Sequence, residues 1–328
     1  MNMLKNKSFL ILGGTGSFGK AMTTRLLKFN VKKIIIFSRD ELKQFEMRNE
    51  IYSNKVEYHI GDIRDKSSLK FAMQNVDYIF FAAALKQVPS CEFFPDEAVK
   101  TNFFGALNVI ELANDIKIKK IIFLSTDKAV EPINSMGMSK SLMEKLVSSK
   151  SLKSKTELII TRYGNVLSSR GSVLPIFINT IQNNGKAYVT SKDMTRFMMK
   201  MDDAIDLVLF ALANGKSGCI YVRKCPSSNI STLARAAGAI LNKKISLNYT
   251  GIRAGEKIHE TLISKFEMIR AKSFKTYFEI TPEIKYNYNQ FMTKGISRKL
   301  HKDYNSSYNL LDIKKLIKLI RPEVLKLI

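Results

Sequence analysis

Residues 8–27, SFLILGGTGSFGKAMTTRLL, decide the fold that this chain is expected to adopt. An apolar run typical of a buried strand leads into a glycine-rich stretch, and a helical pattern continues to Leu27. The glycines allow a tight turn and a close approach of backbone to a pyrophosphate, and the helix N-terminus supplies N–H donors. A glycine-rich turn without a ligand is the alternative, but a strand before and a helix after favour dinucleotide binding. The predicted contacts are Gly13, Thr15, Gly16, Ser17, Phe18 and Gly19.

The end of the second strand indicates how the adenosine part of such a cofactor would be read. A strand over residues 33–37 ends at Ser38 and Arg39. A carboxylate at this place would accept hydrogen bonds from the ribose hydroxyls of NAD. A hydroxyl beside a guanidinium suits a 2′-phosphate instead. We therefore expect NADP, with NAD as the alternative in which Asp40 is the reading carboxylate.

The third strand is predicted over residues 56–60 and ends just before Asp62 and Ile63. An Asp at a strand end can accept a hydrogen bond from the adenine amino group. It can also cap the next helix, but Asp65 or Ser67 fits that cap better. We therefore assign Asp62, with its neighbour Ile63, to the cofactor site.

The fourth apolar run leads into small residues. Ala82, Ala83 and Ala84 would let the cofactor lie across the strand ends, and Lys86 lies where it could meet a phosphate or a sugar hydroxyl. Asn102 falls within the following helical segment. Beside a small-residue turn, its side chain could brace the catalytic end of the next strand.

Strands and helices alternate with short connections through the first half of the chain, which predicts a doubly wound parallel sheet. From about residue 175 this rhythm weakens, and Gly and Asn punctuate shorter segments. We expect a cofactor-binding domain over residues 1–170, to which some later segments return. A smaller substrate lobe is expected over residues 171–328, with an amphipathic helix near residues 310–320.

Residues 121–140, IIFLSTDKAVEPINSMGMSK, carry the next set of reactive groups. An apolar strand turns polar at Thr126, Asp127 and Lys128, and a helix carrying Lys140 is expected over residues 139–150. A buried strand that delivers hydroxyl, carboxylate and ammonium groups at its C-terminal end is where an open α/β sheet places its active site. An ordinary solvated loop after the strand is the alternative.

The composition narrows the possible partners. The 328 residues carry a formal net charge of +24, but the basic residues form no block with interleaved aromatics, which argues against nucleic-acid binding. Cys91, Cys219 and Cys225 have the spacing of neither a zinc site nor a disulfide framework, so we expect no metal ion and a reducing, cytoplasmic compartment. The first apolar run is unlike a signal peptide, and no apolar stretch is long enough to span a bilayer.

Residues 250–260, TGIRAGEKIHE, concentrate charge on a glycine-flanked loop that we expect to open a helix. Arg253 could clamp a diphosphate with two parallel hydrogen bonds, and Glu256 could accept from ribose hydroxyls. The His259-Glu260 pair lacks a second histidine at helical spacing and is therefore no zinc-protease signature. A solvated helix cap is the alternative for this loop.

Several of these motifs together resemble the extended short-chain dehydrogenase/reductases, and more closely the inverting UDP-N-acetylglucosamine 4,6-dehydratases of the capsular polysaccharide branch. The segments that carry the resemblance are the glycine loop and residues 37–41 (FSRDE), 82–89 (AAALKQVP), 90–94 (SCEFF), 125–130 (STDKAV), 162–166 (RYGNV), 170–175 (RGSVLP) and 195–197 (TRF). The resemblance implies a Rossmann sheet, NADP, a UDP-sugar substrate and a homo-oligomer, either a dimer or a hexamer.

The resemblance also implies residue roles. Asp127 and Lys128 would be the acid and the base at the sugar, Thr126 would take the hydroxyl position, and Lys140 would hold the nicotinamide ribose. Met136, four residues before Lys140, occupies the position of the family's usual tyrosine, a replacement known in the capsular branch. Methionine cannot take a proton from the sugar 4-hydroxyl, and Lys128 suits that task only if burial lowers its pKa. The residues implied for UDP and the sugar are Lys86, Asn165, Arg170, Arg196, Arg253 and Glu256.

The implied reaction begins with oxidation at C4 of the sugar. Lys128 would then remove the C5 proton, Asp127 would protonate the departing 6-hydroxyl, and hydride would return to C6 with inversion at C5. A UDP-glucose or UDP-N-acetylglucosamine 4-epimerase is the alternative, because it shares the C4 oxidation but needs no acid at C6. A catalytically silent NADP-binding protein is a further alternative, to which Met136 would be suited.

Overall fold

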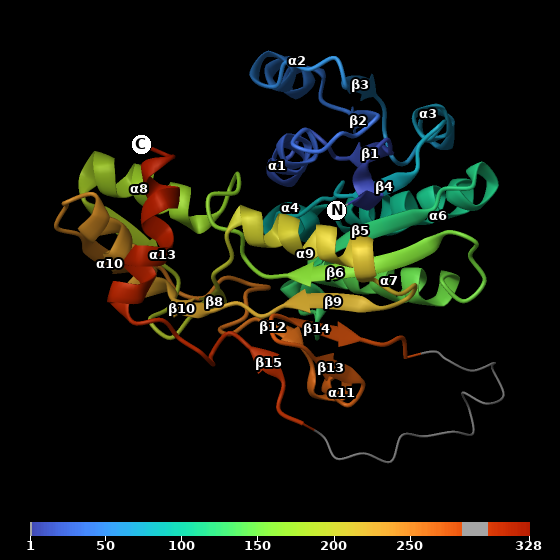
Figure 1. The fold of residues 1–328 in the computed structure, drawn as a ribbon. Coiled ribbons are helices and arrows are strands. Elements are labelled where there is room, and N and C mark those ends of the chain that lie inside the picture. Colours follow the sequence, from blue (N-terminus) through green and yellow to red (C-terminus); the bar gives the residue numbers. More distant parts are fainter. Residues whose placement is uncertain (1, 284–300) are drawn as a thin grey trace.

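A central sheet forms the larger of two lobes in this computed structural model, which describes residues 2–283 and 301–328 (Figure 1). Within the described residues the sheet has nine strands in the order β13-β14-β9-β6-β5-β4-β1-β2-β3. The parallel strands are β1 (Ser8–Leu12), β2 (Lys33–Ser38), β3 (Val56–Ile60), β4 (Tyr78–Phe81), β5 (Lys120–Thr126), β6 (Glu157–Tyr163) and β9 (Ile220–Arg223). The antiparallel strands β14 (Tyr277–Ile280) and β13 (Ala271–Ser273) complete one edge. The predicted doubly wound parallel sheet is confirmed.

Helices cover both faces of this sheet, which explains why its central strands are apolar throughout. One face packs against α1 (Ser17–Leu26), α2 (Glu41–Glu50) and α9 (Met201–Asn214). The other packs against α3 (Lys66–Ala72), α6 (Gly105–Ile116) and α7 (Ser135–Lys150). All residues of β1 and β4 are buried. The strand ends that carry the predicted site therefore rest on a rigid core.

The connection from β4 to β5 is divided into short helical segments. It contains α4 (Val88–Phe93), α5 (Pro95–Val99), the π-helical turn η2 (Lys100–Phe104) and α6. Short π-helical turns often occur at functional sites. The turn holds Asn102, which is fully buried and not at the surface where a mid-helix Asn usually lies.

The smaller lobe has its own hydrophobic core. It is formed by α8 (Val173–Asn184), α10 (Ile230–Ile240) and α13 (Ile313–Leu325), with a parallel pair of strands, β7 (Lys186–Val189) and β11 (Ser246–Tyr249). The three helices lie together at one side of the sheet lobe (Figure 1). The amphipathic tail helix predicted near residues 310–320 is present, but it begins after the cap Asp312 and extends to Leu325.

Short elements connect the two lobes. They are the strand pairs β8 (Thr195–Phe197) with β10 (Ser227–Asn229) and β12 (Thr261–Ile263) with β15 (Tyr304–Asn305), and the helix α11 (Lys265–Met268). The turns η1 (Asn2–Leu4) and η3 (Asp127–Ala129) are 3₁₀-helical. After residue 170 the chain enters the smaller lobe and returns to the main sheet at β9, β14 and β13. The predicted substrate lobe also contains residues 284–300, which lie outside the described residues.

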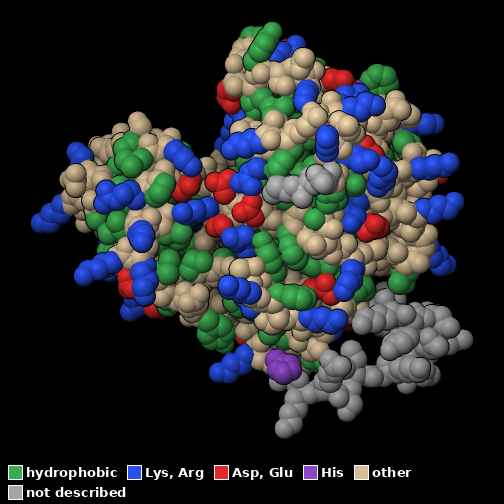
Figure 2. Space-filling model, in the orientation of Figure 1, with side chains coloured by type: hydrophobic (Ala, Val, Ile, Leu, Met, Phe, Trp, Pro, Cys, Tyr) green, Lys and Arg blue, Asp and Glu red, His purple; other side chains and the backbone are tan. Residues whose placement is uncertain are grey.

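Two surface properties bear on partners. Figure 2 shows Lys and Arg side chains spread over both lobes of the visible face, with no single basic stripe. In residues 2–283 and 301–328, no helix combines the length and the apolar character that crossing a bilayer requires.

Candidate functional site

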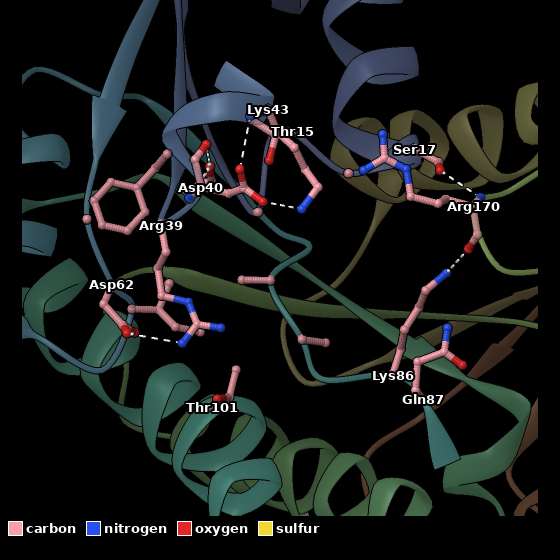
Figure 3. Close-up of a pocket in the computed structure, with 18 of the residues that line it drawn as sticks. Thr15, Ser17, Arg39, Asp40, Lys43, Asp62, Lys86, Gln87, Thr101 and Arg170 are labelled. Atoms are coloured by element: carbon pink, nitrogen blue, oxygen red, sulfur yellow. Dashed lines mark hydrogen bonds and ion pairs between the residues drawn. The ribbon is translucent and has the colours of Figure 1, made fainter. Parts of the chain in front are cut away.

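A pocket of about 420 Å³ lies beside the carboxyl ends of β1, β2, β3 and β4 (Figure 3). This is the edge of an open parallel sheet at which ligands bind. The predicted cofactor residues that line it are Gly13, Thr15, Gly16, Ser17, Ser38, Arg39, Asp62, Ile63, Ala83, Ala84 and Lys86. The structure thus brings together groups from four separate βα connections, as the sequence predicted.

The glycine loop leaves no space for side chains at this edge. A Cβ atom on Gly13 would lie 2.7 Å from the backbone of Ala83, and Gly13 has a positive φ of 76°. A Cβ on Gly19 would lie 2.1 Å from the carbonyl oxygen of Gly14, so Gly19 serves the packing of α1 against the loop. Gly16 caps α1, and Gly16 and Ser17 line the pocket, so the N-terminus of the helix lies where an anion would bind. The cradle fits a dinucleotide pyrophosphate.

Four predicted cofactor residues lie outside this lining, and one of them is Lys140 on α7. The ring of Phe18 packs edge-on against Phe80 in the core, with 6.5 Å between the ring centroids. Gly19 contacts the loop backbone, as described above. The N–H of Ala82 donates to the carbonyl of Leu12 at 3.0 Å and so extends the sheet. Phe18, Gly19 and Ala82 therefore support the pocket and do not line it.

The ribose-reading end of the pocket carries an additional cation. Asp40 caps α2 by accepting from the N–H of Lys43 at 3.0 Å, and the ammonium of Lys43 contacts the same carboxylate. These bonds lower the pKa of Asp40. Arg39 extends toward Asp62 on the opposite wall (Figure 3), with 3.4 Å between its Nη1 and the carboxylate. Lys43 was not predicted as a site residue. It lies three residues after the cap Asp40, so both residues lie at the N-terminal end of α2.

Asp62 lies on the pocket wall in two ion pairs. Its carboxylate accepts from Arg64 at 2.7 Å and from Arg39 at 3.4 Å. Burial alone would raise the pKa of Asp62, but the arginine bonds lower it. Asp65, and not Asp62, caps α3 by accepting from the N–H groups of Ser67 and the next residue. That part of the sequence prediction is confirmed, and the adenine contact stays a prediction.

One predicted substrate residue lines the cofactor pocket instead. The N–H of Arg170 donates to the hydroxyl of Ser17 at 3.1 Å, and the ammonium of Lys86 donates to the carbonyl of Arg170 at 2.8 Å. Figure 3 shows this loop lying against the start of α1. Burial and the charge of Arg170 lower the pKa of Lys86. Arg170 thus lies at the cofactor pocket because the loop before α8 folds over the glycine loop, and its contact with UDP stays a prediction.

The second half of the site begins where β5 ends. The hydroxyl of Thr126 donates to Oδ1 of Asp127 at 2.9 Å, and Nζ of Lys128 donates to the same oxygen at 3.0 Å. Asp127 is fully buried, and its other oxygen, Oδ2, has no hydrogen-bond partner among the described residues. A buried carboxylate oxygen without a partner is costly and marks a place where a donor is expected to bind.

A carboxylate that the sequence did not assign completes this cluster. Oε1 of Glu260 lies 3.1 Å from Nζ of Lys128 and 3.8 Å from Nε of Arg196. Burial alone would lower the pKa of Lys128, but Asp127 and Glu260 outweigh it and raise the pKa. The condition under which Lys128 could be the resting base, a pKa lowered by burial, is therefore not met.

The helix that carries Lys140 begins earlier than predicted. Asn134 caps α7 by accepting from the N–H of Gly137 at 2.8 Å, so α7 starts at Ser135 and includes Met136. Met136 is buried in a small apolar cluster with Cys91, one turn before Lys140. Nζ of Lys140 donates to the carbonyl of Leu124 at 2.7 Å, and burial lowers its pKa to about 8.

Asn102 ties the two halves of the site together. Its amide donates to the carbonyl of Leu85 at 3.0 Å and to the hydroxyl of Ser139 at 2.9 Å, and its oxygen accepts from the N–H of Leu85. It thus joins the loop after β4 to the helix of Lys140. Asn102 was expected to brace the end of the next strand, but its side chain bonds the loop after β4 and helix α7 instead.

The remaining predicted substrate residues are spread out. Asn165 follows β6, and its Oδ1 is buried without a hydrogen-bond partner among the described residues. Arg253 is 66% exposed and lies 3.9 Å from Glu256. Their loop was expected to open a helix, but it leads into β12. The loop instead packs on the catalytic stretch, because Asn134 donates to the carbonyl of Gly255 at 2.7 Å.

Comparisons with known proteins show the family to which the chain belongs. The sequence model of the family described as "Polysaccharide biosynthesis protein" matches residues 9–282. The chain belongs to this family. The resemblance predicted from the sequence is confirmed at the level of this polysaccharide biosynthesis family.

Individual members of the family and of the fold add detail. A protein of Rickettsia bellii named UDP-glucose 4-epimerase is 46% identical, over 96% of this chain and 96% of that protein. The X-ray structure of Pen from Bacillus thuringiensis superposes with a TM-score of 0.90 at 34% identity, covering 99% of each chain. DesIV of Streptomyces venezuelae, a dTDP-glucose 4,6-dehydratase with NAD and TYD bound, has a TM-score of 0.70 at 18% identity, covering 76% of this chain and 86% of DesIV. The last likeness concerns the fold alone.

Proposed function

We propose that this protein is an NADP-dependent UDP-N-acetylglucosamine 4,6-dehydratase that inverts C5. The observation that carries the proposal is the buried Asp127–Lys128 pair, whose oxygen and nitrogen lie 3.0 Å apart at the end of β5. Oxidation at C4 alone requires no second acid–base pair, whereas elimination of water across C5 and C6 requires a base and an acid side by side. The name of the Rickettsia bellii relative supports a UDP-sugar as the substrate.

The cofactor would lie in the 420 Å³ pocket, with its pyrophosphate at the start of α1. Ser38, Arg39 and Lys43 would hold a ribose 2′-phosphate. Asp40, the carboxylate that NAD would need, is already bonded to Lys43 and caps α2. These contacts support NADP over NAD. When bound, the nicotinamide ring would supply the acceptor and the donor of hydride, and it would leave the reaction unchanged.

The protein's own residues would manage the protons. Met136 offers no base for the sugar 4-hydroxyl, but the hydroxyl of Thr126 already donates to Asp127. The 4-hydroxyl proton would pass to Oγ1 of Thr126 as the Thr126 proton passes to Oδ1 of Asp127. Asp127 would then hold the proton that the departing 6-hydroxyl needs. Through this relay, Asp127 would receive the proton that it later donates as the acid.

Lys128 would act at C5. It enters the reaction as an ammonium between two carboxylates, so it must first give up its proton before the amine can take the proton of C5. Lys140, held against Leu124, would orient the nicotinamide ribose. Asn165, Arg196, Arg253 and Glu256, with Lys86, would contact the UDP-sugar.

A UDP-sugar 4-epimerase is the second candidate. The name of the Rickettsia bellii relative favours it, at 46% identity over nearly the whole of both chains. The experiment that separates the two is a product analysis with UDP-N-acetylglucosamine and with UDP-glucose. We expect a 6-deoxy-4-keto product that has lost one water. Formation of the C4 epimer without loss of water would establish the epimerase instead. We further propose a cytoplasmic homo-oligomer that serves surface polysaccharide synthesis, as the family description suggests.

A further inference from the structure

Glu260 places a second buried carboxylate at Lys128. Its side chain is 2% exposed, and its Oε1 lies 3.1 Å from Nζ of Lys128, which also bonds Asp127 at 3.0 Å. Asp127 comes from the end of β5, whereas Glu260 precedes β12 at the border of the smaller lobe. Two carboxylates from distant parts of the chain thus hold one ammonium.

The backbone of Glu260 is fixed independently of Lys128. Its N–H donates to the hydroxyl of Ser306 at 2.9 Å, and the N–H of Ser306 donates back to its carbonyl at 2.8 Å. The same hydroxyl of Ser306 lies 2.8 Å from that of Thr195. Strand β15 therefore sets where the carboxylate lies, and the contact with Lys128 does not depend on a mobile side chain alone.

Glu260 supplies one of the two negative charges that face Lys128. The groups that face Lys128 are the carboxylates of Asp127 and Glu260 and the guanidinium of Arg196, with the ammonium of Lys257 nearby. Oε2 of Glu260 and Oδ2 of Asp127 are both buried without a hydrogen-bond partner among the described residues. In a cluster with a purely structural role, each buried carboxylate oxygen would have a hydrogen-bond partner, because an unpaired buried acceptor costs free energy.

We propose that Glu260 is a positioning residue that accepts the proton of Lys128 and later releases it to solvent. The proposal rests on the proposed function, in which the amine of Lys128 takes the C5 proton. In this step an Nζ–H bond of Lys128 breaks and an Oε1–H bond of Glu260 forms, leaving a neutral amine and a neutral carboxylic acid. Asp127 is unavailable for this proton, because it has received that of the 4-hydroxyl. The amine of Lys128 then takes the C5 proton and becomes an ammonium again. For inversion, a water molecule would protonate C5 on the other face, and Glu260 would release its proton to the hydroxide that this leaves.

The test compares Glu260→Gln with Glu260→Asp and with Glu111→Gln, a matched change at an exposed carboxylate of α6 that pairs with Lys66. The first readout needs no turnover. The reactivity of Lys128 toward an acylating reagent is followed by mass spectrometry as the pH is raised. In Glu260→Gln the ammonium has lost one anion, so Lys128 should become reactive at a lower pH than in the wild type and in Glu111→Gln. An unchanged profile would overturn the proposal.

The second readout uses UDP-N-acetylglucosamine in heavy water. In Glu260→Gln, we expect deuterium exchange at C5 to fall about 100-fold, the lower end of what acid–base catalysis contributes. Reduction of the bound cofactor by the sugar should persist, and Glu260→Asp should restore part of the exchange. Wild-type exchange in Glu260→Gln, or an equal loss of both steps with unchanged Lys128 reactivity, would contradict the proposal.

The two readouts separate this proposal from the function on which it rests. If the wild type forms no 6-deoxy-4-keto product, the proposed function is wrong, while the acylation profile still decides whether Glu260 controls Lys128. If Glu260→Gln does not fold, Glu260→Asp decides. The aspartate side chain is one methylene shorter, so its carboxylate lies farther from Lys128. A wild-type acylation profile together with wild-type exchange in Glu260→Asp would therefore overturn the proposal.

Discussion

The ammonium nitrogen of Lys140 donates to the carbonyl oxygen of Leu124 across 2.7 Å, which ties helix α7 to the strand that ends at Thr126. No carboxylate is within ion-pair distance of Lys140 among the described residues. The position that a tyrosine would usually share with this lysine is filled by Met136, in an apolar cluster. Lys140 is thus a buried cation that bonds a backbone carbonyl and has no carboxylate in ion-pair distance among the described residues, although the charge of Glu144 partly offsets its burial.

The stability of the protein should depend on the titration of Lys140. Burial lowers the pKa of Lys140 to about 8. Between this value and the ordinary 10.5 of an unfolded lysine, the unfolded chain binds more protons, so stability rises with pH across that window. Relative to Lys140→Met, the wild type should gain up to about 3 kcal/mol in unfolding free energy from pH 8 to 10.5. Denaturant titrations of both proteins at several pH values would measure this, and a constant difference would contradict it.

Glu267 should make the fold sensitive to acid. Burial alone would raise its pKa, but the guanidinium of Arg162, at 3.0 Å, overrides burial and lowers the pKa to about 2. Because the folded pKa lies below that of an unfolded Glu, the stabilisation is full above about pH 4.5 and is lost as the pH falls toward 2. Glu267→Gln should cost about 3 kcal/mol at pH 7, within the range for a broken buried ion pair.

The pH dependence of the Glu267→Gln effect is the informative part of that experiment. The difference from the wild type in denaturant unfolding should shrink as the pH falls below 4.5. Glu111→Gln removes an exposed carboxylate and should cost less than about 1 kcal/mol at every pH. A Glu267→Gln effect that stays the same at low pH would show that packing, and not charge, is responsible.

Gly137 should tolerate no side chain. A Cβ there would lie 2.3 Å from the backbone carbonyl oxygen of Lys128, so α7 or the turn η3 would have to move. Alanine usually stabilises a helix relative to glycine by about 1 kcal/mol, but overpacking against backbone costs about 1–3 kcal/mol. Gly137→Ala should therefore lower both the melting temperature and kcat. Ser149→Ala, at an exposed position of the same helix, should change neither, and equal behaviour of the two variants would refute the close contact.

Lys43 should distinguish the two cofactors. If it contacts a 2′-phosphate, Lys43→Met should weaken NADP binding about tenfold, as loss of a charge-assisted hydrogen bond does, and leave NAD binding nearly unchanged. Calorimetric titration with both nucleotides would measure this. Lys70→Met, at an exposed position on α3, is the control. An equal loss of affinity for NAD and NADP would mean that Lys43 meets the pyrophosphate instead.

The first half of the molecule could be predicted because its signals are local. Apolar runs and the glycine stretch fix the strands and the loop, and a strand end always lies at the sheet edge, so Gly13, Ser38 and Ala83 meet without any long-range argument. The start of α7 was also readable, since Asn134 is a favoured capping residue three positions before Gly137. It was missed because a proline-containing loop was expected to continue further.

The cluster around Lys128 could not be predicted in the same way. Glu260 and Arg196 reach Lys128 through β12 and β8, short strands at the border of the smaller lobe that have no periodic pattern. The loop before Glu260 reads as a helix start, yet it continues into a strand because Ser306 bonds its backbone. The position of Arg170 could not be predicted for the same reason. Its loop is polar, and nothing in the sequence indicates on which side of the pocket the loop lies.

The most direct test of the account follows the proton at C5. The wild-type protein is incubated with UDP-N-acetylglucosamine in heavy water, and the product is examined by NMR beside that of Lys128→Ala. We expect a 6-deoxy-4-keto product with deuterium at C5 from the wild type, and no deuterium uptake by Lys128→Ala although the variant still binds the UDP-sugar. Undiminished uptake by Lys128→Ala, or a product that has kept its 6-hydroxyl, would contradict it.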